Sequence, residues 1–150
     1  MEQTLVLIKP DGIQRGLAGN IIDRLERRGL KIAGMKLIHM DEALAKKHYG
    51  IHEGKPFFND LVSYITSSPI IAMVLEGPNA VEVTRKTMGE TNAGNAAPGT
   101  IRGDYAITIG RNLVHGSDSV ENAVNEINLF FKKEEIISYG KDTDKWVIES

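Results

Sequence analysis

His115 stands where a protein can hold a reactive side chain on a rigid support, between an apolar strand and the start of a helix. Leu113 and Val114 are typical of the end of a short strand. Residues 117–119, Ser-Asp-Ser, offer side-chain oxygens that can accept the unpaired N–H groups at a helix start. Gly116 lets the chain turn between the two elements. A lone histidine is more often structural, so a reactive role for His115 depends on the rest of the chain.

The chemistry that suits a histidine at such a junction is nucleophilic group transfer. Its neutral form is abundant at pH 7, and it can split a phosphoryl transfer into two steps through a phosphohistidine, with Mg²⁺ carried by the phosphates. The imidazole needs a partner that fixes its tautomer. Glu126, on the flank of the expected last helix, is the candidate, with Ser117 as the bridging hydroxyl. A helix carboxylate such as Glu126 is otherwise more often simply exposed.

Three basic residues stand at the ends of expected elements and can converge on a phosphate. Lys9 follows the first strand, Arg85 lies in the last turn of a helix, and Arg102 ends an irregular stretch. Thr91 and Asn112 add neutral donors suited to phosphate or sugar oxygens. Taken singly, each charge is more often solvated surface. The chain has neither the G-x-x-x-x-G-K-[ST] nor the G-x-G-x-x-G motif, so phosphoryl chemistry here needs another arrangement.

Two further groups of residues have a functional and a structural interpretation. Phe57, after Pro56, can stack on a nucleobase, whereas its helical spacing equally fits a core residue. His48 and His52 have the spacing of some metal-binding pairs, but Gly50 interrupts the helix between them. We therefore expect no metal bound directly by the protein.

The elements that must position these residues alternate along the chain. Apolar runs predict strands over 4–8, 31–40 and 70–76 and at 113–114. Residues 9–12, Lys-Pro-Asp-Gly, indicate a turn, and 90–104 is expected to be irregular. Periodicity and caps predict helices over 19–28, 41–49, from Pro56 to before Pro69, 78–88, and 120–131 with a stripe formed by Val120, Ala123, Val124, Ile127 and Phe131. This order fits a doubly wound parallel sheet as well as the split β-α-β unit of ferredoxin-like folds.

Composition limits the class of protein. A length of 150 residues with 41% hydrophobic and 25% charged residues predicts a single domain spanning 1–150. A net charge of −2 gives no general field for nucleic acid, so we expect no nucleic-acid partner. There is no cysteine, and no apolar run is long enough to cross a membrane. A cytoplasmic location is the expectation.

Residues 112–119 read Asn-Leu-Val-His-Gly-Ser-Asp-Ser. This segment closely resembles the N-x-[IV]-H-G-S-D-S signature of nucleoside diphosphate kinases. Further segments look like that family in its order and spacing: residues 7–12, 15–17, 48–49, 56–58, 89–92 and 98–104. The resemblance runs from about Thr4 to Trp146.

The resemblance implies a ferredoxin-like α/β sandwich with a four-stranded antiparallel sheet covered by helices. It also implies Mg²⁺-dependent, reversible transfer of the γ-phosphate from a nucleoside triphosphate to a nucleoside diphosphate by a ping-pong route. His115 would be the phosphorylated nucleophile, oriented by Glu126 and Ser117, with Tyr49 close to it. The other matched positions would bind the nucleotide: Lys9 the phosphate and the ribose 3′-hydroxyl, Asn112 the sugar, Arg85, Thr91 and Arg102 the phosphates, and Phe57 the base.

One departure from the family bears on assembly. Where many members read Thr-Asn-Pro, this chain has Thr91-Asn92-Ala93, followed by Gly94. Replacing a proline and adding a glycine makes a loop costlier to order. The resemblance implies a homo-hexamer, with a tetramer as the alternative. The alternative function is a catalytically silent nucleotide- or nucleic-acid-binding regulatory module, but every residue that the mechanism needs is present.

Overall fold

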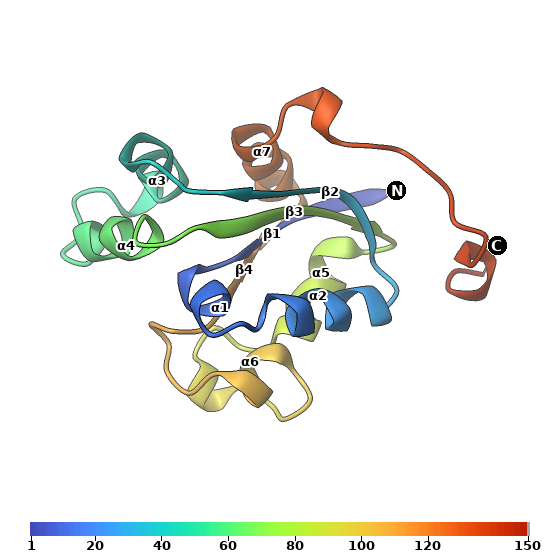
Figure 1. Cartoon of the computed structure of the whole chain (residues 1–150), viewed down its shortest axis with the longest axis horizontal. Coiled ribbons are helices and arrows are strands. Elements are labelled where there is room, and N and C mark those ends of the chain that lie inside the picture. Colours follow the sequence, from blue (N-terminus) through green and yellow to red (C-terminus); the bar gives the residue numbers. More distant parts are fainter. Residues whose placement is uncertain (150) are drawn as a thin grey trace.

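The computed structural model describes residues 1–149 as a four-stranded sheet with helices on both faces (Figure 1). The strands are β1 (Glu2–Ile8), β2 (Lys31–Ile38), β3 (Ile70–Gly77) and β4 (Val114–Gly116). The helices are α1 (Pro10–Gln14), α2 (Ala18–Arg27), α3 (Glu42–His48), α4 (Phe58–Ile65), α5 (Ala80–Met88), α6 (Ile101–Tyr105) and α7 (Val120–Phe130). Short 3₁₀ helices cover Gly50–His52, Ala93–Asn95, Lys133–Glu135 and Asp144–Trp146.

The strand order β2-β3-β1-β4, with every pair antiparallel, decides between the two folds that the sequence pattern left open. It is the ferredoxin-like arrangement and excludes a doubly wound parallel sheet. β1 lies between β3 and β4, and its residues from Thr4 to Ile8 are all buried. The long apolar run of β1 follows from this central place, because both faces of the strand are covered.

Alternate residues of β1 pack into two separate hydrophobic cores. Leu5 and Leu7 belong to a cluster with residues of α3, α4 and α7, whereas Val6 and Ile8 belong to a cluster with residues of α2, α5 and α6. Figure 1 shows α3, α4 and α7 on one side of the sheet and α1, α2, α5 and α6 on the other. The period-2 alternation of a strand therefore builds the three layers.

Two stretches are more helical than predicted. The expected turn at 9–12 is the start of α1, because Pro10 suits the first helical position, where no N–H is needed. The stretch 90–104, expected to be irregular, contains the 3₁₀ helix Ala93–Asn95 and the start of α6. The Thr100 side chain caps α6 by accepting the Gly103 N–H at 3.0 Å. Such short helices carry too few residues to show a period.

The predicted stripe of the last helix is partly wrong. Ala123, Ile127 and Phe130 face the sheet, whereas Val120 and Val124 are 53% and 55% exposed. Apolar residues occur on two faces of α7, so spacing alone did not identify the buried one. The cap was predicted correctly, since the Ser119 hydroxyl accepts the Asn122 N–H at 3.1 Å.

The last described residues run beside the sheet without burying their aromatic side chain. Trp146 is 81% exposed, and polar contacts hold the segment: the Lys31 ammonium donates to Asp144 at 2.8 Å and to the Tyr139 carbonyl at 2.9 Å. Between Met1 and Glu149, the helices are too short or too polar to cross a bilayer.

Candidate active site

Antiparallel pairing of β1 with β4 brings Lys9, which follows β1, close to His115, which lies on β4. His115 pairs with Leu7, two residues before Lys9, and the Lys9 N–H donates to the Leu113 carbonyl at 2.8 Å. His115 is the middle residue of β4, which extends to Gly116, whereas the sequence predicted that the strand ends at Val114 and that His115 lies at the junction after it. A strand holds the imidazole more firmly than a junction would.

The backbone just before His115 is strained. Leu113 is fully buried with a φ of +74°, a conformation that is rare for a side chain of this size. Its N–H donates to Asp11 Oδ2 at 3.0 Å, and Asp11 Oδ1 accepts a hydrogen bond from the Tyr64 hydroxyl. This network fixes the turn from which β4 starts.

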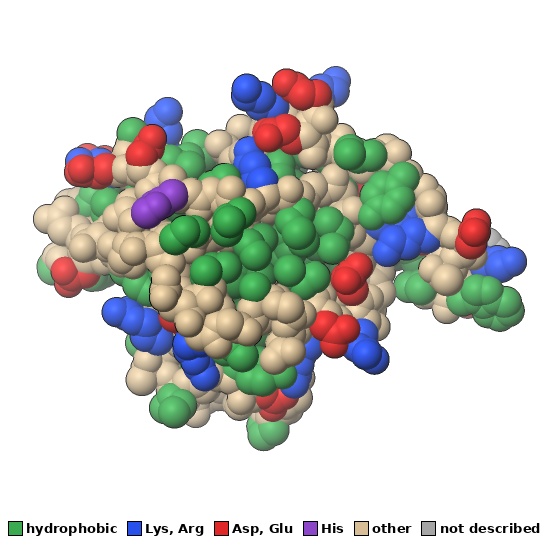
Figure 2. All heavy atoms as spheres, viewed as in Figure 1, with side chains coloured by type: hydrophobic (Ala, Val, Ile, Leu, Met, Phe, Trp, Pro, Cys, Tyr) green, Lys and Arg blue, Asp and Glu red, His purple; other side chains and the backbone are tan. Residues whose placement is uncertain are grey.

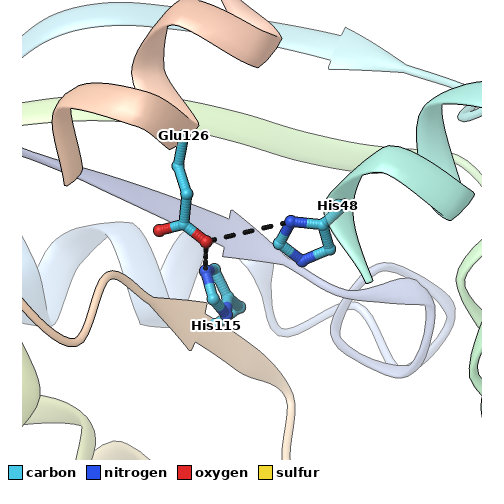
Figure 3. A group of neighbouring side chains, drawn as sticks. All are labelled: His48, His115 and Glu126. Carbon is cyan, nitrogen blue, oxygen red and sulfur yellow. Dashed lines mark hydrogen bonds and ion pairs between the residues drawn. The ribbon is translucent and has the colours of Figure 1, made fainter. Parts of the chain in front are cut away.

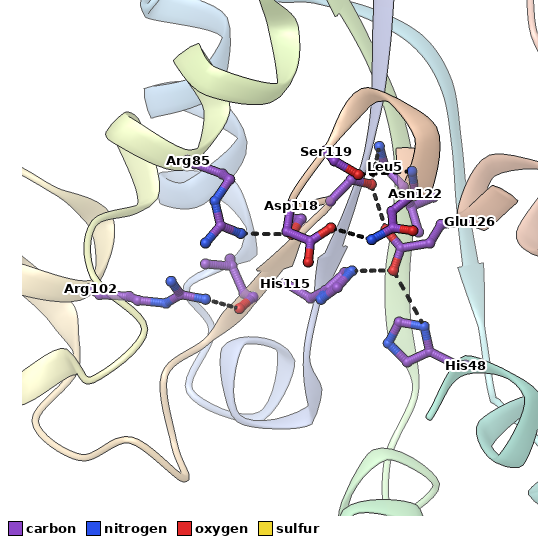
Figure 4. Close-up of polar contacts among 12 residues, drawn as sticks. Leu5, His48, Arg85, Arg102, His115, Asp118, Ser119, Asn122 and Glu126 are labelled. Atoms are coloured by element: carbon purple, nitrogen blue, oxygen red, sulfur yellow. Dashed lines mark hydrogen bonds and ion pairs between the residues drawn. The ribbon is translucent and has the colours of Figure 1, made fainter. Parts of the chain in front are cut away.

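Glu126 contacts both His115 and Ser117, so the carboxylate is the bridge between them and the Ser117 hydroxyl, predicted as the bridge, lies on its other side. His115 Nε2 lies 2.8 Å from Glu126 Oε2, and the Ser117 hydroxyl donates to Glu126 Oε1 at 2.5 Å (Figure 4). Ser117 is in turn tied to β1, because its hydroxyl accepts the Leu5 N–H at 3.3 Å. The carboxylate therefore has a fixed direction toward the imidazole.

The charge on Glu126 decides which ring nitrogen of His115 carries the proton. Burial acts most strongly and raises the pKa, but the hydrogen bonds from His115 and Ser117 outweigh it and hold the pKa of Glu126 below its usual value. An ionised carboxylate only accepts hydrogen bonds, so Nε2 donates to it. In the neutral ring the lone pair is then on Nδ1.

His48, the last residue of α3, lies against this pair. Its ring centroid is 4.8 Å from that of His115, edge to face, and its Nδ1 is 3.8 Å from Glu126 Oε2 (Figure 3). Its side chain is 3% exposed. Burial, together with the nearby His115, lowers the pKa of His48 to about 3, so this ring is neutral at pH 7.

Two arginines contact the carbonyls on either side of His115. Arg102 donates to the Val114 carbonyl at 2.6 Å, and Arg85 contacts the Gly116 carbonyl at 3.4 Å (Figure 4). Arg102 also donates to the carbonyls of Gly89 and Asn112, at 2.9 and 3.2 Å. An arginine has five N–H donors, so donors remain for a ligand. Burial, with Arg85 nearby, lowers the pKa of Arg102 to about 10.

Lys9 is the third basic group. Burial lowers its pKa to about 8; Asp11 opposes this shift, while Arg102 and Arg111 add to it. Its ammonium lies 5.6 Å from the ring centroid of Tyr64, over which the Arg111 guanidinium lies at 4.5 Å. The site therefore concentrates positive charge without a matching number of carboxylates, which suits a phosphate.

Asn112 is buried, and its amide donates to the Thr91 carbonyl at 2.9 Å. Its Oδ1 is buried and has no hydrogen-bond partner within residues 1–149. Thr91 itself is exposed, and its carbonyl rather than its hydroxyl makes this contact. The loop before α6 is thereby tied to the strand that carries His115.

Tyr49 and Phe57 lie on the α3–α4 side. The Tyr49 ring is 4.7 Å from that of His48, and burial raises its pKa to about 12, so the phenol stays protonated. Phe57 is 45% exposed and lies 5.3 Å from the ring of His52. Phe58 is the buried member of the pair, so the exposed aromatic face belongs to Phe57.

A cavity of about 310 Å³ opens beside the histidine. Its walls include His48, Tyr49, His115, Asp118 and Glu126. A larger hollow of about 760 Å³, lined by Arg85 and Glu90 among others, shares Asp118 with it. The smaller cavity is the one that gives access to the imidazole.

Comparison with known proteins identifies the family to which this chain belongs. The family model described as nucleoside diphosphate kinase matches residues 2–136. The nucleoside diphosphate kinases of Pelotomaculum thermopropionicum and Roseiflexus castenholzii are 59% and 56% identical over 149 residues, 99% of this chain and 100% of theirs. The chain belongs to the nucleoside diphosphate kinase family.

Solved structures of the family agree. A halophilic nucleoside diphosphate kinase from Halobacterium salinarum in complex with CDP has a TM-score of 0.96 and 52% identity, covering 99% of both chains. A nucleoside diphosphate kinase family protein from Babesia bovis has a TM-score of 0.96 and 39% identity, covering 99% of this chain and all of the other. The predicted fold and enzyme class are confirmed: the protein is a phosphotransferase acting on nucleotides, and the silent binding module is not favoured.

Sequence reasoning missed several contributors to this kinase's site. Asp11 and Tyr64, which hold Leu113, and Arg111 are brought together by the fold from distant positions. From the sequence, His48 had no role beyond a candidate metal pair with His52 and a place in one of the segments that resemble the family. The neighbours that matter to it are Glu126 and His115, which no spacing along the chain relates to it.

Proposed function

We propose that His115 is the nucleophile of this nucleoside diphosphate kinase and that it takes the phosphate on Nδ1. The observation that carries the proposal is the 2.8 Å contact of Nε2 with Glu126, which leaves the lone pair on Nδ1. In the first half-reaction, Nδ1 attacks the γ-phosphorus, and the bond to the β–γ bridging oxygen breaks. The nucleoside diphosphate leaves with that oxygen.

The second half-reaction reverses the first with another nucleotide. A terminal phosphate oxygen of the acceptor diphosphate attacks the phosphorus, and the P–N bond to His115 breaks. The electron pair returns to Nδ1, so the histidine ends in its starting tautomer. Glu126 stabilises the positive charge that the ring gains while it is phosphorylated.

The remaining predicted residues would bind the nucleotide. Lys9, Arg85 and Arg102 would hold phosphate oxygens, because all three lie around the strand that carries His115. Asn112 and Lys9 would contact the ribose, the unpartnered Asn112 Oδ1 accepting from a sugar hydroxyl. Thr91 would add a donor to phosphate, Tyr49 would lie close to the transferred group, and exposed Phe57 would stack on the base.

Mg²⁺ would be held mainly by the phosphates of the nucleotide. The site fits this arrangement, because basic groups dominate it and Glu126 is committed to His115. Asp118 is an exposed carboxylate on the cavity wall and would be available to the water shell of the ion. Bound Mg²⁺ supplies charge stabilisation at the phosphate oxygens.

We also propose that residues 1–150 form one domain and that copies of it assemble into a homo-oligomer, for which a hexamer is the expectation. Figure 2 shows hydrophobic side chains gathered over the middle of one face. β2 is a sheet edge that exposes Leu37 to 67%, which is typical of a surface that a partner covers.

The experiment that tests the mechanism omits the acceptor. The protein is mixed with γ-labelled ATP and Mg²⁺, and bound label is measured after acid and after base. We expect one acid-labile, base-stable label per chain that a nucleoside diphosphate then removes. His115→Ala should take up none, while His39→Ala, at an exposed position directly after β2, should label normally. Equal labelling of His115→Ala would exclude this histidine.

A further inference from the structure

His48 carries a buried imidazole that the proposed phosphate transfer does not use. Its Nδ1 is buried and has no hydrogen-bond partner in the described part of the chain. It lies 3.8 Å from Glu126 Oε2, the oxygen that His115 Nε2 meets at 2.8 Å. Figure 3 shows the two rings and the carboxylate converging from α3, β4 and α7, with one ligand atom from each lying within 4.8 Å of the others.

We propose that His48, His115 and Glu126 form a binding site for a divalent transition-metal ion of the Zn²⁺ type, and that the bound ion switches phosphate transfer off. Two imidazole nitrogens and a carboxylate oxygen are a set that Zn²⁺ prefers, with water in the fourth position. Imidazole is a poor ligand for Mg²⁺, which takes oxygen atoms. The site is therefore distinct from the nucleotide-borne Mg²⁺.

The three ligand atoms lie within 4.8 Å of one another and would have to close to tetrahedral spacing around an ion. Bonds of about 2.0–2.1 Å in a tetrahedral site place ligand atoms about 3.3 Å apart. The His115–Glu126 contact of 2.8 Å would widen, and the 3.8 Å gap between His48 and Glu126 would narrow. The histidine and the carboxylate both remain partly exposed at the cavity, so an ion and its water can reach them.

A purely structural role explains His48 less well. Its ring packs edge to face on His115 and on Phe130, with centroids 4.8 and 5.5 Å apart. A phenylalanine ring would fill that space equally. The imidazole instead buries a nitrogen without a partner, which is costly unless something binds it.

Inhibition follows from the tautomer of His115. A metal ion binds Nε2 through a lone pair, so it displaces the hydrogen bond between Nε2 and Glu126. The Nε2 proton then passes to Nδ1, and the neutral ring keeps one proton throughout. Nδ1 now carries the proton instead of the lone pair and cannot attack phosphorus. Binding of the ion is independent of the proposed function, whereas this inhibitory consequence rests on it.

The direct test measures metal without nucleotide. Co²⁺ is titrated into the full chain at pH 7.5, and its visible absorption is followed. We expect one Co²⁺ per chain with the intense bands of tetrahedral coordination, displaced by Zn²⁺. His48→Phe, which preserves ring shape, and Glu126→Gln should each weaken binding at least about tenfold. His39→Gln should not, and circular dichroism checks that each variant is folded.

The outcomes that overturn the proposal are specific. Absence of tetrahedral Co²⁺ bands in the folded wild type would remove the site. Unchanged Co²⁺ affinity in His48→Phe would remove His48 from it, and loss of binding in His52→Gln alone would move the site to the neighbouring ring. ¹⁵N NMR with Zn²⁺ gives a second readout. We expect the His115 proton on Nδ1, and an Nε2–H that persists at saturation would contradict the mechanism.

A labelling experiment tests inhibition by the bound ion separately from phosphate transfer to His115. Zn²⁺ should suppress uptake of label from γ-labelled ATP in the wild type, and each variant is compared with itself without Zn²⁺. In His48→Phe the suppression should be lost. No labelling under any condition, with Co²⁺ still bound, would refute the phosphohistidine and leave the metal site standing. Normal labelling that Zn²⁺ leaves unchanged would refute the switch.

Discussion

At the scale of single residues, the site depends on one carboxylate with two hydrogen-bond donors. Glu126 accepts from Ser117 and from His115, so the serine sets the direction of the carboxylate and the carboxylate sets the tautomer of the imidazole. Ser117 reaches back to β1 through Leu5. His115, the proposed nucleophile, is thus positioned from α7 and from the centre of the sheet at once.

Glu126→Gln should therefore lower kcat far more than it raises KM. A neutral amide can donate its own N–H to Nε2, which leaves the proton on Nδ1 and removes the lone pair. We expect kcat to fall by up to about 10⁴-fold, the scale seen when a carboxylate that orients a histidine becomes an amide. Glu121→Gln, an exposed carboxylate on the same helix, is the matched control. A rise in KM alone would place Glu126 in nucleotide binding instead.

The lowered pKa of Lys9 predicts that kcat/KM depends on pH. Its pKa of about 8, lowered by burial, lies below that of an ordinary lysine. Lysine is charged below its pKa, so the proposed contact of Lys9 with phosphate would be present below pH 8 and would be lost as pH rises through 8. We expect kcat/KM, which reports the free enzyme, to decline there.

Lys9→Arg separates this lysine from other groups that titrate in the same range. Arginine keeps its charge over the whole range, so the decline near pH 8 should disappear even if the activity itself is lower. A variant profile that keeps the same decline would assign it to another group.

At the scale of elements, short loops that contain residues with positive φ angles position the site. Gly89 ends α5 with a φ of +88°, and its carbonyl accepts from Arg102. A Cβ added there would lie 2.4 Å from Thr100 Oγ1, the atom that caps α6. The close approach of two helix ends therefore requires glycine.

Gly89→Ala should lower the free energy of unfolding by about 1–3 kcal/mol through backbone strain, plus the cost of moving Thr100. Gly99→Ala is the matched control, because Gly99 has a φ of +95° but nothing within 4 Å of an added Cβ. Thermal unfolding should place Gly89→Ala clearly below Gly99→Ala. Equal melting temperatures would show that Thr100 moves aside freely.

The elements that were predicted well from the sequence are those whose signals come from neighbouring residues in the chain. The apolar run of β1 and the cap of α3, where Asp41 accepts the Leu44 N–H at 2.7 Å, depend on neighbouring residues only. α6 and the exposure of Val124 could not be predicted, because the first is too short for a period and the second depends on which face meets the sheet. Likewise His48 and Tyr64 reach the site only through tertiary contacts.

At the scale of the whole molecule, antiparallel pairing explains why residues distant in sequence share one site. Lys9 after β1, His115 on β4 and Arg85 on α5 meet because β1 and β4 are neighbours and α5 covers both. Alternating strands and helices could not reveal this, since that order fits parallel and antiparallel sheets alike. The family resemblance supplied the fold that pattern had left open.

The proposed homo-oligomer can be tested at the edge of the sheet. Leu37→Lys places a charge on the open edge of the sheet, and we expect it to reduce the mass of the oligomer in analytical ultracentrifugation. Ile51→Lys changes a still more exposed apolar residue, in the 3₁₀ helix after α3, and should leave the mass unchanged. If Leu37→Lys leaves the mass unaltered, the β2 edge is not a subunit contact.

The position of the phosphate on the ring decides whether His115 Nδ1 is the nucleophile. Uniformly ¹⁵N-labelled protein is phosphorylated with ATP and Mg²⁺, freed of nucleotide, and examined by ³¹P and ¹⁵N NMR. We predict coupling of phosphorus to His115 Nδ1, a proton still on Nε2 facing Glu126, and loss of the signal when a nucleoside diphosphate is added. Phosphorus on Nε2, or on a residue other than His115, would contradict the account.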